Sequence, residues 1–183
     1  MTPRSMSLLG PTLETERLIL RPPIADDFEP WAAFMAHEST SFIGGPQHPA
    51  IAWRGLATVV GAWTMQGFSM FSVIEKATGR WVGRLGPWQP HGWLGTEVGW
   101  GLAPEALGKG YATEGAAAAI DWAFDTLGWT EVIHTIDIEN QGSIALAERL
   151  GSRRLRSAVL PPPLEWPVEV YGQTREAWRA RRA

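Results

Sequence analysis

The sequence predicts an α/β (α+β) domain with a mixed, mostly antiparallel sheet of about seven strands and flanking helices. Three observations predict this class. A hairpin signal joins strand candidates at 68–75 and 80–86. A strand, helix, strand, helix unit occupies 97–151, and its crossover implies a parallel pair of strands within the sheet. Two further strand candidates, 152–160 and 169–174, follow this unit around a proline-rich loop.

One strand and two helices are expected before the hairpin. Residues 13–21 alternate in polarity and predict the first strand. Asp26 and Asp27 predict an acidic cap for a helix that ends near His37. A second helix is expected over about 50–65, where apolar residues recur at helical spacing. Those residues are Trp53, Leu56, Val60 and Trp63.

Residues typical of helix caps and helix ends mark the boundaries within the strand, helix, strand, helix unit. Its long helix, about 110–127, has an alanine-rich apolar stripe and stops at Gly128. A buried strand over 131–138 follows, and then Asn140 caps a short helix whose end is marked by Gly151. The stripe of the long helix is Ala116, Ala119, Ile120, Ala123, Phe124 and Leu127.

Composition bounds the class of protein before any motif is considered. The 183 residues suit a single domain, which we place at 13–183 after a flexible tail at 1–12. A net charge of −3, without a basic block before the short Arg179 to Arg182 run, argues against nucleic acid as a partner. The absence of cysteine excludes disulfides, thiol nucleophiles and thiolate metal sites.

Metal sites, export and membrane insertion are also not expected. The 4 histidines show no metal-ligand spacing, so no metal is predicted. Residues 1–10 lack the apolar core of a signal peptide, and no stretch approaches the roughly 20 apolar residues of a membrane helix. We therefore expect a cytoplasmic protein without a membrane partner, either a monomer or a homodimer.

A glycine-bearing turn lies between the strand at 97–102 and the long helix. Gly108 and Gly110 bracket Lys109, so the backbone can bend tightly and bring N–H groups close to an anion. The following helix directs the positive end of its dipole to the same place. The turn therefore indicates a phosphate site, although a tight structural connection between strand and helix fits the glycines equally well.

Spacing separates the phosphate motifs that such a turn could represent. A P-loop ending at Gly108-Lys109 would need glycine at 103 and serine or threonine at 110, but the chain has Ala103 and Gly110. A dinucleotide fingerprint that begins at Gly108 would need a third glycine where Thr113 stands. Both nucleotide motifs are therefore disfavoured.

Four motifs in a fixed order carry a resemblance to a known family. They are Leu13-x-Thr15-x-Arg17-Leu18-x-Leu20-Arg21, Glu97-Val98-Gly99-Trp100-x-Leu102, Leu107-Gly108-Lys109-Gly110-Tyr111-Ala112-Thr113-Glu114 and Asn140-x-x-Ser143-x-x-Leu146-x-x-x-Leu150-Gly151. With them the chain resembles the GNAT superfamily of acetyl-CoA-dependent N-acyltransferases, and more closely its ribosomal-protein-alanine N-acetyltransferase branch. Two positions depart from the pattern. Glu105 replaces a usual glutamine or arginine and is expected to face solvent, and Leu107 replaces a usual aromatic residue.

The resemblance implies acetyl-CoA as co-substrate and a set of residues that bind it. The strand at 97–102 would splay from the strand at 131–138, with the pantetheine arm between them. The implied CoA-binding residues are Val98, Gly99, Trp100, Gly101, Leu102, Leu107, Gly108, Lys109, Gly110, Tyr111, Ala112, Thr113, Asn140 and Ser143. Structural alternatives stay open for five of them, among them Ser143, which could be an ordinary serine in the first turn of its helix. Lys109 could be a solvated loop lysine, Asn140 a plain N-cap, and Gly99 and Gly101 packing positions beneath Trp100.

Transfer of an acetyl group to a primary amine also needs a base, because such amines are protonated at neutral pH. Glu97 is the leading candidate, acting through water, and Asp137 and Glu139 are alternatives. The alternative for Glu97 is a structural one without a catalytic role, in which it is a solvated glutamate at the end of a strand. Ser143 is the candidate hydrogen-bond donor near the sulfur, because Ala147 occupies the position where the family often has a tyrosine acid.

The remaining expectations concern the oxyanion, the acceptor and turnover itself. The resemblance implies that a backbone N–H near Gly101 or Leu102 stabilises the oxyanion. Five tryptophans would surround the acceptor side and favour an acceptor with apolar or cationic faces. They are Trp31, Trp53, Trp88, Trp93 and Trp166. The predicted reaction is direct attack in a ternary complex, on a protein N-terminus or a small-molecule amine. The alternative is a non-catalytic CoA-binding regulatory domain.

Overall fold

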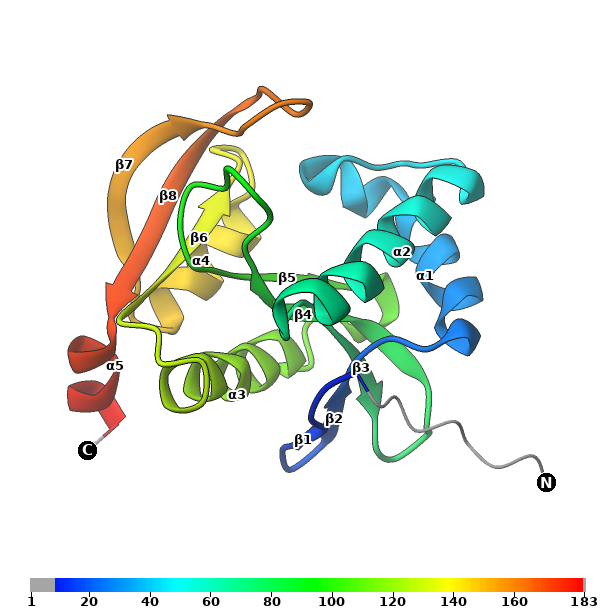
Figure 1. The fold of residues 1–183 in the computed structure, drawn as a ribbon, viewed down its shortest axis with the longest axis horizontal. Helices are drawn as coiled ribbons and strands as arrows, with labels where there is room; N and C mark the ends of the chain where they lie inside the picture. Colours follow the sequence, from blue (N-terminus) through cyan, green and yellow to red (C-terminus); the bar gives the residue numbers. More distant parts are fainter. Residues whose placement is uncertain (1–8, 183) are drawn as a thin grey trace.

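An eight-stranded mixed sheet forms the centre of the protein in a computed structural model, which describes residues 9–182 (Figure 1). The strand order is β1-β2-β3-β4-β5-β6-β8-β7, and only β5 and β6 pair in parallel. The strands are β1 (Leu13–Glu14), β2 (Leu18–Arg21), β3 (Phe71–Glu75), β4 (Trp81–Trp88), β5 (Glu97–Leu102), β6 (Glu131–Ile136), β7 (Arg153–Val159) and β8 (Pro167–Thr174). The predicted mixed α/β class is confirmed.

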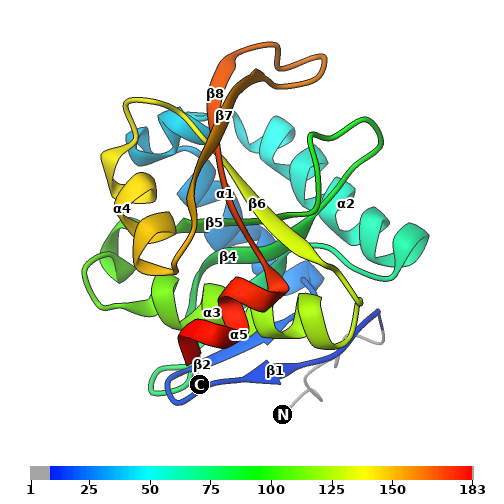
Figure 2. The same ribbon diagram turned by 90° about the vertical axis from the view of Figure 1, so that its left-hand side faces the viewer.

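Helices cover both faces of the sheet (Figure 1, Figure 2). The α-helices are α1 (Phe28–Met35), α2 (Pro49–Gln66), α3 (Tyr111–Asp125), α4 (Gln141–Arg149) and α5 (Arg175–Arg182). Short 3-10 segments lie at Ala25–Asp27, Glu38–Ile43 and Pro104–Ala106. Phe34 of α1 lies over Gly101 on one face, and Gly115 of α3 lies over Leu85 from the other. None of these helices is long and apolar enough to cross a membrane.

The alanine stripe of α3 packs directly on the sheet, as the sequence predicts. Five of its six residues are buried, and Leu127 is partly buried just beyond the helix. Gly115 is required for this close approach, because a Cβ there would lie 2.7 Å from the Leu85 side chain. The short side chains therefore bring the N-terminus of α3 close to the end of β5, where the predicted anion turn lies.

Several predicted elements differ in detail from the structure. The predicted first strand is two short strands, because Thr15 turns the chain by bonding to Leu18. Asp27 does not cap α1 itself; its buried carboxylate binds the Arg21 guanidinium and accepts from the Ile24 backbone N–H, which caps the 3-10 turn just before α1. Helix α5 was not predicted from the sequence. Residues 1–8 of the predicted tail lie outside the described residues.

β5 and β6 separate immediately after they begin to pair. Their single registered pair is Glu97 with Ile133. Beyond it, the His134 ring bridges the two strands, since its Nδ1 lies 2.6 Å from the Val98 carbonyl oxygen. Its Nε2 lies 3.0 Å from the Ser152 hydroxyl. Burial lowers the pKa of His134 to about 4, so this ring is neutral and donates its Nδ1–H to the carbonyl.

Candidate active site

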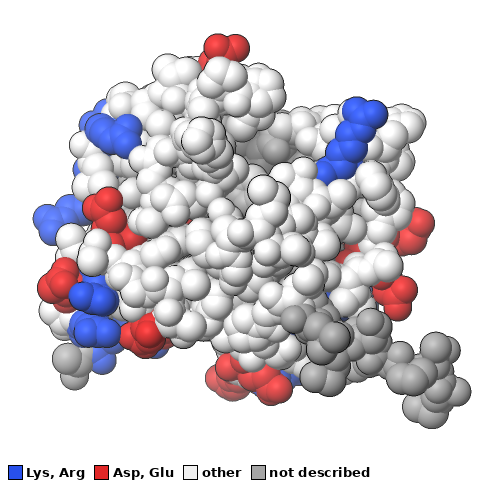
Figure 3. Space-filling view, viewed as in Figure 1, with Lys and Arg blue, Asp and Glu red and all other residues white. Residues whose placement is uncertain are grey.

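A pocket of about 360 Å³ opens where β5 and β6 separate. Its walls come from α1, α2, β4, β5, β6, the start of α4 and the loop between β7 and β8. In the space-filling view a hollow lies between this loop and α2, and the surface around it is mostly uncharged (Figure 3). Within the pocket, the charged side chains are those of Arg84, Glu97 and Asp137.

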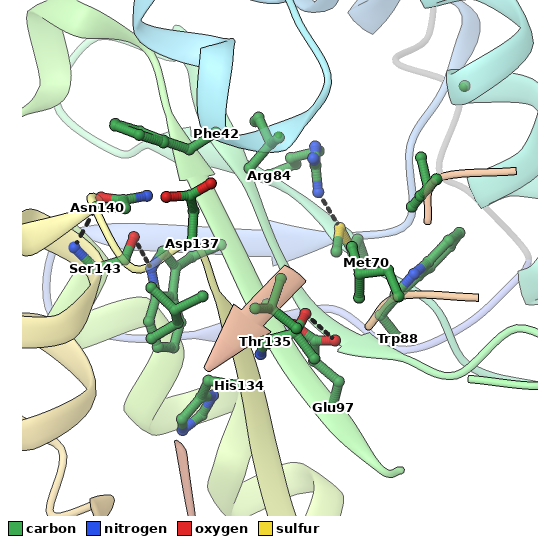
Figure 4. A pocket seen from close by; sticks show the side chains of 18 of the residues that line it. Phe42, Met70, Arg84, Trp88, Glu97, His134, Thr135, Asp137, Asn140 and Ser143 are labelled. Carbon is green, nitrogen blue, oxygen red and sulfur yellow. Dashed lines mark hydrogen bonds between the residues drawn. The ribbon is translucent and has the colours of Figure 1, made fainter. Parts of the chain in front are cut away.

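Glu97 lies in this pocket and is only 5 % exposed, rather than being a solvated residue at a strand end. Its carboxylate accepts hydrogen bonds from the Trp93 indole and from the backbone N–H and the hydroxyl of Thr135 (Figure 4). Burial raises the pKa of Glu97 to about 7, and the hydrogen bonds oppose the rise only in part. A carboxylate with this pKa can accept a proton near neutral pH.

Arg84 is a polar group of the pocket that sequence reasoning missed. It lies on β4, and its guanidinium contacts the Met70 sulfur and lies 5.5 Å from the centre of the Trp31 ring. Its Nε is buried without a hydrogen-bond partner among the described residues. Burial lowers the pKa of Arg84 to about 10, which leaves the group charged at neutral pH. The one signal in the sequence was a charge within an otherwise apolar strand.

The predicted anion turn has the backbone geometry of a cradle. Gly108 and Gly110 have φ angles of 73° and 79°, in the left-handed region that favours glycine. A Cβ at Gly108 would meet nothing within 4 Å, so space is open above the backbone. Gly110 is the N-cap of the 15-residue helix α3 and caps it with no side chain, which leaves the first-turn N–H groups of Tyr111, Ala112 and Thr113 available.

Charge placement at the cradle also suits an anion. Glu114 is in the first turn of α3, but its carboxylate faces away and binds the Arg17 guanidinium at 2.7 Å and the Thr15 hydroxyl at 2.6 Å. Arg17 further donates to the Lys109 carbonyl at 2.8 Å and so fixes the loop. Although partial burial opposes it, these hydrogen bonds hold the pKa of Glu114 below its usual value. The residues present therefore fit a pyrophosphate.

Three other residues near the cradle have surface positions. The Lys109 ammonium lies 3.8 Å from Glu75 and 5.7 Å from the centre of the Tyr111 ring. Glu105 forms an exposed ion pair with Arg80 at 3.2 Å. Leu107 is 56 % exposed. The cradle consequently depends on backbone groups rather than on side-chain charge.

The start of α4 brings two predicted residues to the other end of the pocket (Figure 4). The Asn140 side chain accepts from the Ser143 backbone N–H at 3.1 Å, which is the N-cap interaction. The Ser143 hydroxyl accepts from the Trp100 indole at 3.1 Å, so its own proton is free to be donated. Ala147 is buried and packs near Trp100, and it has no polar group to offer.

The two other candidate bases are placed differently from each other. Asp137 lines the pocket close to Asn140, and its carboxylate accepts from the Glu139 backbone N–H at 2.8 Å (Figure 4). Glu139 itself is exposed and is not among the residues that line the pocket. Of the five tryptophans expected near the acceptor, Trp53 is 58 % exposed on α2. The other four line the pocket: Trp31, Trp88, Trp93 and Trp166.

Gly99 and Gly101 of β5 face the side of the sheet that α1 covers. A Cβ at Gly101 would lie 3.0 Å from Phe34, and one at Gly99 would lie 3.1 Å from Met70. They therefore make room for α1 and Met70 rather than for packing beneath Trp100. Because the Thr96 carbonyl accepts from Ile133 of β6, strand alternation directs the N–H groups of the even-numbered residues into the split. Leu102 therefore suits an oxyanion better than Gly101.

Among residues 9–182, no group of three or more histidine, aspartate or glutamate side chains is arranged to hold a metal ion. The site that the structure presents is instead an anion cradle, a split between two parallel strands, and a buried carboxylate at the base of that split.

Comparison with known proteins agrees with this arrangement. The family model described as the acetyltransferase (GNAT) domain matches residues 17–153. An acetyltransferase structure from Agrobacterium tumefaciens is 32 % identical with a TM-score of 0.81, covering 90 % of this chain and 95 % of that one. A ribosomal-protein-S5-alanine acetyltransferase from Vibrio fischeri is 18 % identical, covers 92 % and 98 % of the two chains with a TM-score of 0.71, and supports the fold alone.

Matches to curated sequences are shorter. The FsC-acetyl coenzyme A-N(2)-transacetylase of Aspergillus fumigatus is 34 % identical over 88 residues, which cover 45 % of this chain and 37 % of that protein. This relative and two proteins of Bacillus subtilis strain 168 are covered over 37 % to 60 % of their own lengths. The fold and the site together define an acetyltransferase architecture. The chain belongs to the GNAT acetyltransferase family.

Proposed function

We propose that the protein transfers the acetyl group of acetyl-CoA to a primary amine, by direct attack of the amine within a ternary complex. The observation that carries the proposal is the buried Glu97, whose pKa is raised to about 7 at the place where β5 and β6 separate. The relative from Aspergillus fumigatus, whose name specifies acetyl coenzyme A and N(2), supports the same donor and the same kind of acceptor atom.

The donor end of the site is assigned from the cradle and the split. The N–H groups at Gly108 to Thr113 would hold the pyrophosphate, and Val98 to Leu102 would contact the pantetheine arm. Asn140 would contact the same arm through its amide N–H₂, since its oxygen already caps α4. Acetyl-CoA supplies an acetyl group activated as a thioester. The protein must then accept a proton from the amine, stabilise the negative charge that develops on the carbonyl oxygen, and offer a proton to the departing sulfur.

Glu97 is assigned as the base. An amine with a pKa of about 10.4 is almost fully protonated at neutral pH, so a proton must leave it before the C–N bond forms. Glu97 accepts this proton, through water, and Thr135 and Trp93 hold the carboxylate in place. A backbone N–H of β5 that points into the split would stabilise the oxyanion, and Ser143 donates its hydroxyl proton in a hydrogen bond to the sulfur as the C–S bond breaks.

Free CoA release tests this proposal. Because the chain has no cysteine, a thiol reagent reports product CoA without protein background. We expect release that saturates with both acetyl-CoA and an amine from a panel of peptides, polyamines, amino acids and aminoglycosides. Saturable CoA binding without release from any amine would contradict the proposal and favour the non-catalytic CoA-binding regulatory domain that Ala147 leaves open.

The proposed cellular setting rests on charge and hydropathy rather than on the site. We propose a single domain at 13–183 that works in the cytoplasm as a monomer or homodimer, with neither nucleic acid nor membrane as partner. The net charge of −3 and the lack of a membrane-spanning helix among the described residues support this setting.

A further inference from the structure

An arginine without an anionic partner lies in the acceptor half of the pocket. Arg84 has five N–H donors, yet its side chain contacts only the Met70 sulfur and the face of Trp31 within the described part of the chain. Its Nε is buried with no acceptor, and it forms no ion pair with any residue of 9–182. The guanidinium is half-buried and feels the charge of Glu97 without contacting it, so an anionic ligand that bonds to it directly would stabilise it.

The position of Arg84 relative to Glu97 is set by strand register. Arg84 pairs with Gly101, and Trp88 pairs with Glu97, so all four residues share one face of the sheet. The Cα atoms of Gly101 and Glu97 are about 13 Å apart along an extended strand. Gly99 lies between them and presents no side chain. The Glu97 carboxylate and the Met70 side chain both lie over Gly99, so the floor of the pocket carries the base and, beside Met70, the cation of Arg84.

The other charged groups of the pocket do not neutralise Arg84. Glu97 raises the pKa of the guanidinium electrostatically, but its carboxylate is committed to Trp93 and Thr135. Asp137 lines the pocket beside Asn140, where its carboxylate accepts from the Glu139 N–H (Figure 4). The acceptor that does meet Arg84 is a thioether, which is a weak one and which a flexible methionine can withdraw.

We infer that Arg84 binds a carboxylate group of the acceptor, so that the substrate class is a small amine that also carries a carboxylate. The inference rests on the proposed function and names its acceptor. A planar guanidinium matches a carboxylate through two parallel hydrogen bonds. A carboxylate suits the site better than a phosphate, because Arg84 is the only lysine or arginine among the described residues that line the pocket. The apolar walls suit a carbon chain between amine and carboxylate.

This inference reverses the expectation that the tryptophans alone favour an apolar or cationic acceptor. The Trp31 ring faces the guanidinium, whose Nη1 donates to Met70, so a ligand would meet Nη2 and, once Met70 withdraws, Nη1 as well. The aromatic residues then orient the cation rather than bind the acceptor directly.

Matched acids and amides test the inference. The probes are ω-amino acids from 4-aminobutanoate to 8-aminooctanoate and the corresponding ω-amino amides, in which the amine is far enough from the other end that the main difference is the charge there. We expect the wild-type protein to prefer the best acid over its amide by about tenfold to a hundredfold in kcat/KM, the range for a charge-assisted hydrogen-bonded pair. Arg84→Gln should abolish this preference while leaving the KM for acetyl-CoA unchanged, and Arg84→Lys should retain part of it.

Arg80→Gln is the matched control, because Arg80 is exposed, pairs with Glu105 and lies outside the pocket. It should keep the full preference. Equal use of acids and amides by the wild-type protein, or a preference that survives in Arg84→Gln, would overturn the inference. Misfolding is not expected, since Arg84→Gln removes a half-buried charge that no anionic side chain of the described residues contacts.

A binding measurement separates this inference from the proposed function. Trp31 lies against Arg84, so a bound acid should change tryptophan fluorescence in the wild-type protein and not in Arg84→Gln. If no amine releases CoA but the acids bind in this way, the proposed function fails and the carboxylate site stands. If CoA is released from amides as readily as from acids, the proposed function stands and the carboxylate site fails.

Discussion

The proposed donor half of the site, which is the cradle, and its proposed acceptor half, which is the pocket, are built in opposite ways. The cradle at Gly108 to Thr113 is one continuous stretch of backbone, and its nearby charges are turned outward into ion pairs. The acceptor half is assembled from side chains of separate elements, among them Glu97 of β5 and Arg84 of β4, both with pKa values shifted by burial. A backbone site depends on conformation, whereas a side-chain site depends on desolvation, so different substitutions should disable each half.

Gly110→Glu is expected to have the largest effect. The new side chain would occupy a backbone position with φ of 79° and add negative charge at the helix N-terminus. Because several charge-assisted hydrogen bonds to the pyrophosphate would be lost together, CoA affinity should fall by about a thousandfold or more. Isothermal titration with CoA measures this directly.

Gly128→Glu is the matched control at the opposite end of α3. Gly128 also has a left-handed φ, 70°, and a Cβ added there would meet nothing within 4 Å. It carries the same substitution and a similar backbone strain but lies away from the cradle, so CoA affinity should stay near that of the wild type. Unchanged affinity in Gly110→Glu would show that the cradle is assigned to the wrong segment.

Glu97→Gln should disable the acceptor half with the next largest effect. Loss of a general base slows turnover by about a hundredfold to a thousandfold. The affinity for CoA should not change, because Glu97 takes no part in the cradle or in the hydrogen bonds of Glu114 to Thr15 and Arg17. The comparison between the two halves is sharpened if Gly110→Glu changes binding and Glu97→Gln changes only kcat.

The pH profile gives an independent test of Glu97. Its raised pKa means that the carboxylate is protonated below about 7, so kcat/KM of the wild type should fall as pH drops through that value and rise to a plateau above it. Glu97→Gln should lack this inflection. Should Asp137→Asn remove the inflection instead, the base would be Asp137. Glu139→Gln serves as the control, because Glu139 is exposed and outside the pocket.

The difference between the two halves also explains which parts of the site could be predicted from the sequence and which could not. The cradle could be predicted because its glycines, its helix and its neighbours are contiguous, and left-handed φ angles at Gly108 and Gly110 explain their spacing. The motif on β5 located Glu97, but not its burial, which depends on Trp93 and Thr135 covering it in three dimensions. Arg84 was missed because its role depends on cross-strand register.

The same reason applies to errors in the fold. Asp27 had the position of a helix cap, yet its carboxylate is buried against Arg21 of β2 and Ser72 of β3. Local signals predicted where helices and strands occur. They did not predict which polar side chains are withdrawn from solvent by contacts with other segments of the chain.

Glu114→Gln should weaken the donor half moderately. The substitution removes the ion pair with Arg17 that fixes the first turn of α3 and, through the Lys109 carbonyl, the loop before it. The backbone cradle itself stays in place, so we expect CoA affinity to fall by about threefold to tenfold, the range of one partly exposed ion pair. Glu14→Gln is the control, because it breaks the exposed pair with Lys76 away from the cradle.

Lys109→Ala should have the smallest effect, although Lys109 is the only cation inside the glycine turn. Its ammonium lies 3.8 Å from Glu75 and over the Tyr111 ring, so part of its charge is already balanced. An exposed pair of this kind contributes about 1 kcal/mol or less, and CoA affinity should change by less than about fivefold. A loss as large as that of Gly110→Glu would mean that Lys109 leaves Glu75 to bind the pyrophosphate, and that the donor half also depends on a side-chain charge.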